Sequence, residues 1–236
     1  MDLAALGRMK REGRKIVGVV AWDYQIAQIV ERAGVDLVSV GDSVGVNLWG
    51  QKEAEITLEE MLVVCKAVRR GVKRALLSCD LPSAFISEAN AKRLLAEGGA
   101  DLVNIEAGAE AVKRLAAAGV PVFAEFHGGR PAAGLVQEAK DLQAAGAVLL
   151  DFRHSGPEAG AAVTQAVSIP VLGGLGGGPW LDGRLRMAHA AIGYAASHLD
   201  SAAETYANVA RATHEAIAAY AADVRAARHL KGQRPA

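Results

Sequence analysis

The sequence has few aromatic residues, two cysteines, no surplus of either charge and no long apolar run. Aromatic residues make up 5% of the 236 residues, so a core drawn from the 51% apolar residues must be mainly aliphatic and alanine-rich. The 26 basic and 26 acidic residues give a formal net charge of zero. This argues against a nucleic acid or an anionic membrane as partner, because both need a basic surplus. Since no window approaches ~18 uncharged apolar residues, no transmembrane helix is expected.

The two cysteines and the N-terminal residues bear on the cellular compartment. Cys65 is expected in a helix and Cys79 in a strand, without the spacing of a metal site. The N-terminus lacks the basic-then-apolar order of a signal peptide. The sequence therefore predicts reduced core cysteines and a cytoplasmic protein.

One pattern recurs along the chain: a helix-like segment, a glycine, a short apolar run and then an acidic residue. The glycines are Gly34, Gly71, Gly99, Gly119 and Gly146, and the acids are Asp42, Asp80, Glu106, Glu125 and Asp151. Such apolar runs are typical of parallel strands buried on both faces, and the glycines are expected at helix ends. In a barrel of β/α units the carboxyl ends of the strands meet at one mouth, where active sites lie. The sequence thus predicts an acidic mouth whose repulsion needs a cation or shared protons to offset it.

The runs predict repeated β/α units in one domain. A first strand is expected over 15–22 and a seventh over 169–173, and Thr57 with Glu60 forms a capping-box pattern. A helix is expected from about Leu185, without a clear eighth strand before an alanine-rich helical segment over 200–228. The expected fold is α/β: a single TIM-type (β/α)8 barrel domain over 1–236, irregular at its end, with a C-terminal helical extension and tail from about residue 200.

Asp42, Asp80 and Glu106 end three consecutive predicted strands, so their side chains are expected to meet. Hard oxygen ligands on rigid elements suit Mg²⁺, with Mn²⁺ or Co²⁺ as alternatives. Zinc is less favoured because no cysteine or histidine joins the cluster. His127 and His154 are interpreted as polar loop residues.

A divalent cation in such a mouth suggests chemistry on a 2-oxo acid. The carbonyl and carboxylate oxygens can chelate the metal, which stabilises the enolate formed when the neighbouring carbon loses a proton. Asp151 and Glu125 are the candidate bases, and Ser43 is a candidate contact to the substrate carboxylate. The sequence contains no Ser-His-Asp signature, no lysine at a strand end and no cofactor fingerprint. The glycine-rich residues 174–178 match no phosphate-binding pattern, and close backbone packing is at least an equal interpretation.

Several segments resemble ketopantoate hydroxymethyltransferases, a family in the phosphoenolpyruvate mutase/isocitrate lyase superfamily of barrels. The similar segments cover 9–16, 21–24, 33–45, 57–61, 67–71, 80–82, 168–170 and 182–183. The resemblance implies hydroxymethyl transfer from methylenetetrahydrofolate to 3-methyl-2-oxobutanoate with Mg²⁺, in pantothenate biosynthesis. It also implies that Asp42, Asp80 and Glu106 are the metal-site acids and that Ser43 contacts the oxo acid.

The sequence departs from the family pattern at the predicted substrate site. Asn104 replaces a lysine, Glu125 a histidine and Asp151 a glutamate, and the loop over 128–131 is short. These changes leave open a lyase or aldolase of the same superfamily that acts on a different oxo or hydroxy acid. A non-catalytic barrel used for binding or assembly is a further alternative. The resemblance also implies a homo-oligomer, for which the alanine-rich C-terminal helices offer a packing surface.

Overall fold

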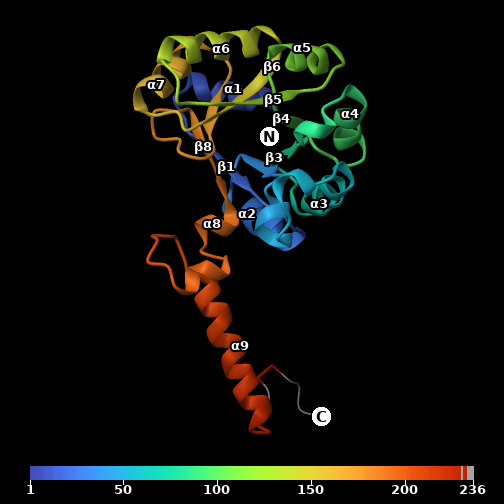
Figure 1. The fold of residues 1–236 in the computed structure, drawn as a ribbon, viewed down its shortest axis with the longest axis vertical. Coiled ribbons are helices and arrows are strands. Elements are labelled where there is room, and N and C mark those ends of the chain that lie inside the picture. Colours follow the sequence, from blue (N-terminus) through green and yellow to red (C-terminus); the bar gives the residue numbers. More distant parts are fainter. Residues whose placement is uncertain (230, 233–236) are drawn as a thin grey trace. The chain divides into compact units, whose positions relative to one another are not determined.

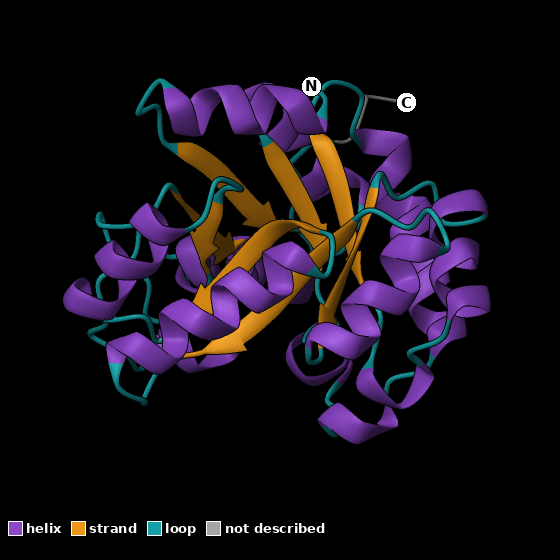
Figure 2. Ribbon diagram, turned by 90° about the horizontal axis from the view of Figure 1, so that it is seen from above, coloured by secondary structure: helices purple, strands orange, loops and turns teal. Residues whose placement is uncertain are grey.

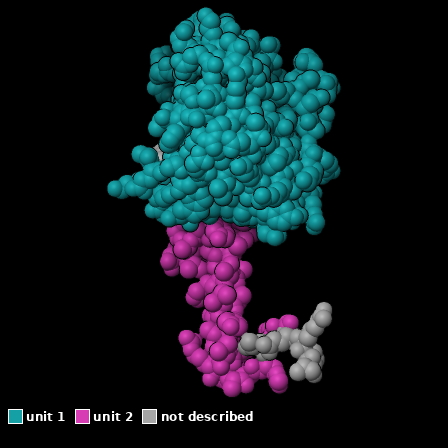
Figure 3. Space-filling model, turned by 90° about the vertical axis from the view of Figure 1, so that its right-hand side faces the viewer, with its two compact units in different colours: residues 1–186 teal, residues 187–236 magenta. Residues whose placement is uncertain are grey.

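The computed structural model describes residues 1–229, 231 and 232. Its internal contacts divide the chain into two compact units, Met1–Arg186 and Met187–Ala236, which Figure 3 colours separately. The division falls earlier in the chain than the expected start of the C-terminal extension near residue 200.

Eight parallel strands close into a barrel in chain order, as the sequence predicted (Figure 1). The strands are β1 (Ile16–Val20), β2 (Leu37–Val40), β3 (Leu76–Asp80), β4 (Leu102–Glu106), β5 (Val122–His127), β6 (Ala147–Arg153), β7 (Val171–Gly173) and β8 (Gly183–Met187). Helices surround these central strands (Figure 2). They are α1 (Leu3–Arg11), α2 (Tyr24–Ala33), α3 (Leu58–Gly71), α4 (Glu88–Ala96), α5 (Ala109–Ala117), α6 (Ala132–Ala144) and α7 (Pro157–Ala166).

The barrel interior begins with one apolar layer to which every strand contributes one side chain. These residues are Ile16, Leu37, Leu76, Leu102, Phe123, Leu149, Leu172 and Leu185. Leu6 and Met9 of α1 belong to the same cluster and are 1% and 5% exposed. This layer gives the aliphatic core that the scarcity of aromatic residues predicted. A larger apolar cluster packs the outward strand faces against the helices.

The local signals at helix ends are mostly confirmed. Thr57 and Glu60 form the predicted capping box at the start of α3. Four of the five repeat glycines have positive φ, namely Gly34, Gly99, Gly119 and Gly146. Gly71 differs, because it is the last residue of α3 and is required by close packing: a Cβ there would lie 2.7 Å from the Ala27 Cβ of α2.

The expectation of a helix from about Leu185 is wrong, because Leu185 lies in the eighth strand, which the sequence did not show clearly. β8 pairs with β7 through Leu172 and Gly183, and the Ile16 amide donates to the Asp182 carbonyl at 2.9 Å. Within β8, Arg184 and Arg186 are exposed while Gly183 and Leu185 are buried. Because the two arginines alternate with the buried residues, this short strand lacks the continuous apolar run that predicted the other strands.

The second unit contains α8 (Ala188–Ala191), a 3-10 turn over Ala196–Leu199 and α9 (Val209–Arg225). The alanine-rich segment therefore forms one long helix, and 200–208 precede it without regular structure. No helix among the described residues is both long and apolar enough to cross a membrane.

Cys65 of α3 and Cys79 of β3 are free and buried, as predicted. Burial raises the pKa of the Cys79 thiol, and a hydrogen bond with Cys65 raises it further. The two thiols are therefore neighbours, which their separation in the sequence does not reveal.

We predict that Gly183→Ala disrupts the packing of β8 against β1, where the first and last strands of the barrel meet; we call this contact the seam. The new Cβ would overlap the Ile16 carbonyl oxygen and lie 2.7 Å from Leu172 Cδ2. Overpacking of this kind should lower the free energy of unfolding by about 1–3 kcal/mol or more, measured by urea denaturation. The control is Gly134→Ala in α6, where a Cβ meets nothing within 4 Å and helix propensity should make the change neutral or stabilising. Equal stability of Gly183→Ala and the wild type would contradict this view of the seam.

Candidate functional site

The polar interior of the barrel is built on the two-residue period of the strands. Above the apolar layer, β2 to β6 each contribute one buried polar residue: Ser39, Ser78, Asn104, Glu125 and Asp151. Two positions further along β3 to β6 are Asp80, Glu106, His127 and Arg153, the last residues of those strands. Side chains two apart face the same side of a strand. Each of these strand residues therefore lies above an apolar residue that anchors its strand, whereas Asp42 lies in the loop after β2.

A cavity of about 310 Å³ opens at this mouth, and four of the five predicted acids line it. These are Asp42, Asp80, Glu106 and Glu125, so the three acids predicted to bind the metal share one cavity. The Asp42 amide donates to Asp80 Oδ2 at 3.2 Å. The fifth acid, Asp151, is fully buried and is not among the described lining residues. Ser43 follows Asp42 and is half-buried, also outside that lining.

Burial of these acids raises the pKa of three carboxyl groups. Desolvation, followed by the charge of Asp42, raises the pKa of Asp80 to about 7. Desolvation raises the pKa of Glu125 to about 9, and the charges of Asp151, Asp80 and Glu106 act in the same direction. The pKa of Asp151 is raised by burial as well, although Arg153 opposes the shift. The mouth thus holds protons that a bound cation would displace.

Arg153 is a site residue that the sequence reasoning missed. Its Nε donates to Asp151 Oδ2 at 3.1 Å, and its Nη2 lies 2.5 Å from Glu125 Oε2. Arg153 also lines the cavity. A signal was available, because Arg153 follows the strand-end acid Asp151 by two residues and must face the same side of β6. The guanidinium offsets part of the charge of the acids beside it.

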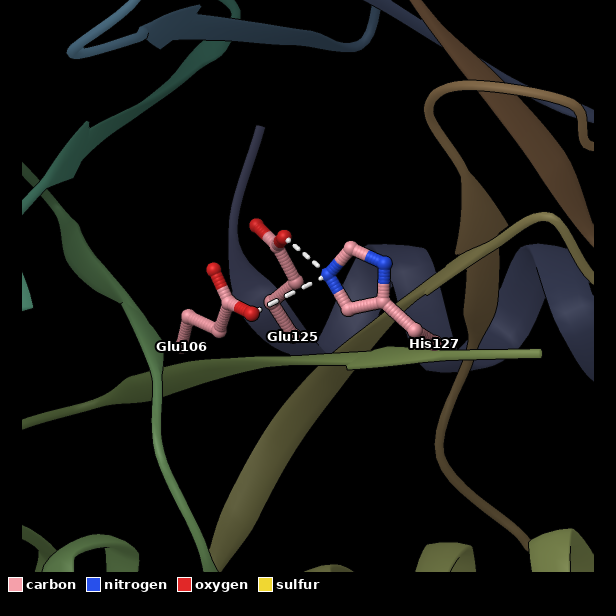
Figure 4. A group of neighbouring side chains, drawn as sticks. All are labelled: Glu106, Glu125 and His127. Atoms are coloured by element: carbon pink, nitrogen blue, oxygen red, sulfur yellow. Dashed lines mark hydrogen bonds and ion pairs between the residues drawn. The ribbon is translucent and has the colours of Figure 1, made fainter. Parts of the chain in front are cut away.

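His127 also belongs to the site, whereas it was expected in a loop. It is the last residue of β5, and its Nε2 lies 3.2 Å from Glu106 Oε1 and 3.1 Å from Glu125 Oε1 (Figure 4). The ligand atoms of these three residues lie within 4.8 Å of one another. The grouping shares Glu106 with the predicted metal-binding trio and adds an imidazole nitrogen. His154 follows β6 at the mouth, with its ring 6.2 Å from that of His127.

The donor set fits a divalent cation. Asp42, Asp80 and Glu106 offer the carboxylate oxygens that Mg²⁺ prefers, and Mn²⁺ or Co²⁺ would also accept a nearby imidazole. Asn104 is 2% exposed and donates from Nδ2 to Asp80 Oδ1 at 3.1 Å, which orients that carboxylate. Its own Oδ1 is buried and has no hydrogen-bond partner among the described residues.

The glycine-rich residues 174–178 pack closely against the site. The Gly174 amide donates to Asp151 Oδ1 at 2.7 Å, and a Cβ on Gly174 would lie 3.0 Å from Asp151 Oδ2. Absence of a side chain at Gly174 therefore lets the backbone reach the buried carboxylate. This contact supports the packing interpretation of the segment.

We predict that Asp80→Asn stabilises the metal-free protein in a pH-dependent way. The pKa of Asp80 is about 7 in the folded chain against an ordinary value of 3.8 for an aspartate, so its ionisation costs stability as pH rises between these values. One pKa unit corresponds to about 1.4 kcal/mol, so we expect a gain of up to about 4 kcal/mol above pH 7 that vanishes near pH 4. Urea denaturation across this range measures it. The exposed Asp141→Asn is the control, and a gain that does not change with pH would contradict the prediction.

The chain has extended similarity to one family of enzymes. A family model described as ketopantoate hydroxymethyltransferase matches residues 1–131 and 126–229. The 3-methyl-2-oxobutanoate hydroxymethyltransferase of Trichodesmium erythraeum (strain IMS101) is 36% identical over 245 residues, covering 92% of this chain and 92% of that relative. The enzyme of the same name from Geobacillus thermodenitrificans (strain NG80-2) is 35% identical over 245 residues, covering 92% and 88%.

Solved structures with the same fold come from a wider group. 2,3-Dimethylmalate lyase, a PEP mutase/isocitrate lyase superfamily member, superposes with a TM-score of 0.69 at 15% identity, over 98% of this chain and 89% of that chain. Phosphonopyruvate hydrolase in complex with oxalate and Mg++ superposes with a TM-score of 0.66 at 15% identity, over 100% and 92%. These two likenesses show the fold alone. The family model and the sequence relatives show more: the chain belongs to the ketopantoate hydroxymethyltransferase family, a family of enzymes.

Proposed function

We propose that the protein is a Mg²⁺-dependent enzyme that forms or breaks a carbon–carbon bond next to the carbonyl of a 2-oxo acid. The observation that carries this proposal is that Asp42, Asp80 and Glu106 line one cavity, in a chain of this family. The complex of phosphonopyruvate hydrolase with oxalate and Mg++ gives further support, because oxalate has the adjacent oxygen-bearing carbons of a 2-oxo acid. The reaction named for the family relatives, hydroxymethyl transfer to 3-methyl-2-oxobutanoate, is the first candidate.

In this proposal Asp42, Asp80 and Glu106 hold the cation, with Mn²⁺ or Co²⁺ as substitutes. When bound, the cation supplies positive charge that stabilises the negative charge developing on the 2-oxo oxygen. Asn104 orients Asp80, and Ser43 binds the substrate carboxylate. Glu125 lines the cavity and accepts the proton from C3, while the fully buried Asp151 is the alternative base. C3 then bonds to a one-carbon unit, for which methylenetetrahydrofolate is the family donor; water supplies the hydroxyl group and tetrahydrofolate leaves.

A superfamily lyase or aldolase is the second candidate, favoured by Glu125 and Asn104 at the substrate side of the cavity. A barrel without catalysis is the third. Asp80 and Glu125 weigh against the third candidate, because burial of both acids disfavours their ionised forms and yet both remain at the cavity.

We predict that the protein exchanges the C3 proton of 3-methyl-2-oxobutanoate with solvent deuterium when Mg²⁺ is present and no folate is added. Proton NMR should show exchange that a chelator abolishes and that Asp42→Asn or Glu125→Gln reduces by about 10²-fold or more. Because burial raises the pKa of Glu125 and the base must be ionised, the rate should rise with pH, and bound Mg²⁺ should bring this rise to a pH below the value of about 9 for the metal-free protein. Glu158→Gln, an exposed change on α7, is the control. Exchange that persists with chelator would contradict the metal-dependent mechanism, and its absence in protein that binds Mg²⁺ would exclude this substrate.

We also infer a homo-oligomer that works in the cytoplasm. The free, neighbouring thiols of Cys65 and Cys79 suit a reducing compartment. Ile217, Tyr220 and Val224 are exposed on α9 and share one face by their spacing.

We predict that light scattering gives a mass above that of the 24.5 kDa monomer and that Ile217→Asp lowers it. A charge on the apolar face of α9 should oppose burial against a second copy. The control is Glu215→Gln on the same helix, which should keep the mass of the wild type. A monomeric wild type would refute the assembly.

A further inference from the structure

Arg153 is the fixed positive charge of the cavity. Among the described residues that line it, four are carboxylates and Arg153 is the one arginine or lysine. Its side chain is 25% exposed, so the guanidinium is held by the protein and is still accessible from the mouth. Arg153 would therefore supply the positive charge that pairs with an anionic group bound at a distance from the cation.

The contacts of Arg153 leave donors for a ligand. A guanidinium carries five N–H groups. Nε donates its hydrogen to Asp151 at 3.1 Å, and Nη2 forms an ion pair with Glu125 at 2.5 Å. The remaining donors have no hydrogen-bond partner among the described residues. A carboxylate can accept two parallel hydrogen bonds from such a group.

The strand order places Arg153 across the mouth from the first metal acids. Asp42 follows β2 and Asp80 ends β3, whereas Arg153 ends β6. In a closed barrel of eight strands in chain order, β6 lies halfway round from β2 in either direction. Glu106 ends β4 and lies nearer, two strands from β6. A 2-oxo acid held at one end by Asp42 and Asp80 therefore presents its other end toward β6.

We propose that Arg153 is a specificity residue that binds a second carboxylate, so that the compound which this site forms or cleaves is a dicarboxylic 2-oxo acid. The inference rests on the proposed function, since it takes the oxo-acid end to be held by the metal acids. It refines the substrate class. In the bond-forming direction the second carboxylate belongs to a carbonyl donor, and in the cleaving direction to the leaving fragment. The inference therefore favours the lyase or aldolase over hydroxymethyl transfer.

The chemistry around Arg153 disfavours an apolar group at this end. A branched alkyl group would cover the guanidinium, remove water from its remaining donors and supply no acceptor in return. An anionic group supplies the hydrogen-bond acceptors. It also offsets the positive charge that Arg153 and a bound divalent cation bring to the site. A charge-assisted pair of this kind changes affinity by about tenfold or more.

The test compares two ligands of similar shape by titration calorimetry with saturating Mg²⁺. 2-Oxoglutarate carries a carboxylate where 5-methyl-2-oxohexanoate carries an isopropyl group. The wild type should bind 2-oxoglutarate at least about tenfold more tightly. Arg153→Met should remove this preference, and Arg153→Lys should retain part of it because the charge remains. Arg130→Met, at an exposed arginine after β5 that pairs with Glu138, is the control and should leave the preference unchanged.

A double variant and the deuterium-exchange assay separate failure of this inference from failure of the proposed function. Arg153→Met leaves the buried Asp151 without its positively charged partner, so Arg153→Met with Asp151→Asn supplies a variant in which that charge is also removed. It too should bind both ligands alike. Equal affinity of the wild type for the two ligands, or a preference for 2-oxoglutarate that survives in both variants, would overturn the role of Arg153. Neither result would overturn the proposed function. Failure of both ligands to bind with Mg²⁺, together with no deuterium exchange into 3-methyl-2-oxobutanoate, would overturn the proposed function and this inference with it.

Discussion

The closing of eight strands around one layer of apolar side chains is the constraint on which the rest of the structure depends. Each strand contributes one residue to this layer, from Ile16 on β1 to Leu185 on β8. The layer holds the strands in register, so residues two and four positions later must face the same interior. Asp182 and Gly183 complete the seam: Asp182 Oδ2 accepts from the Val171 amide and Lys10 Nζ, both at 2.8 Å. These two residues belong to the family-like segments, but their structural role is to close the barrel.

The closed barrel also causes repulsion between negative charges in the site. Closing the barrel brings Asp42, Asp80, Glu106 and Glu125 to one cavity above the buried Asp151. Three factors reduce the repulsion among these carboxylates. They are the protons on carboxyl groups of raised pKa, the guanidinium of Arg153, and the divalent cation that we propose. Burial of these acids disfavours their ionised forms, which costs stability and brings the fold no evident return. Their presence at strand ends is therefore best explained by a ligand that needs them.

Much of the fold and part of the site could be predicted from the sequence, because both depend on local pattern. The apolar runs predicted the strands, and the acids that close the runs predicted the mouth. β8 was missed because two exposed arginines interrupt a strand of five residues. His127 and Arg153 were missed because each follows an acid in the same strand and was not considered with it, although the two-residue period places both at the mouth. The neighbouring thiols of Cys65 and Cys79 depend on helix–strand packing, which no local pattern encodes.

The central claim is that the acids of β2 to β4 hold one divalent cation. It is tested most directly by diffraction from crystals grown with Mn²⁺, in which anomalous scattering locates the ion without reference to activity. The account predicts a single strong peak between the carboxylates of Asp42, Asp80 and Glu106. A peak at Glu106, Glu125 and His127 with no density at Asp42 and Asp80 would contradict it, as would no peak at Mn²⁺ concentrations that saturate binding in solution.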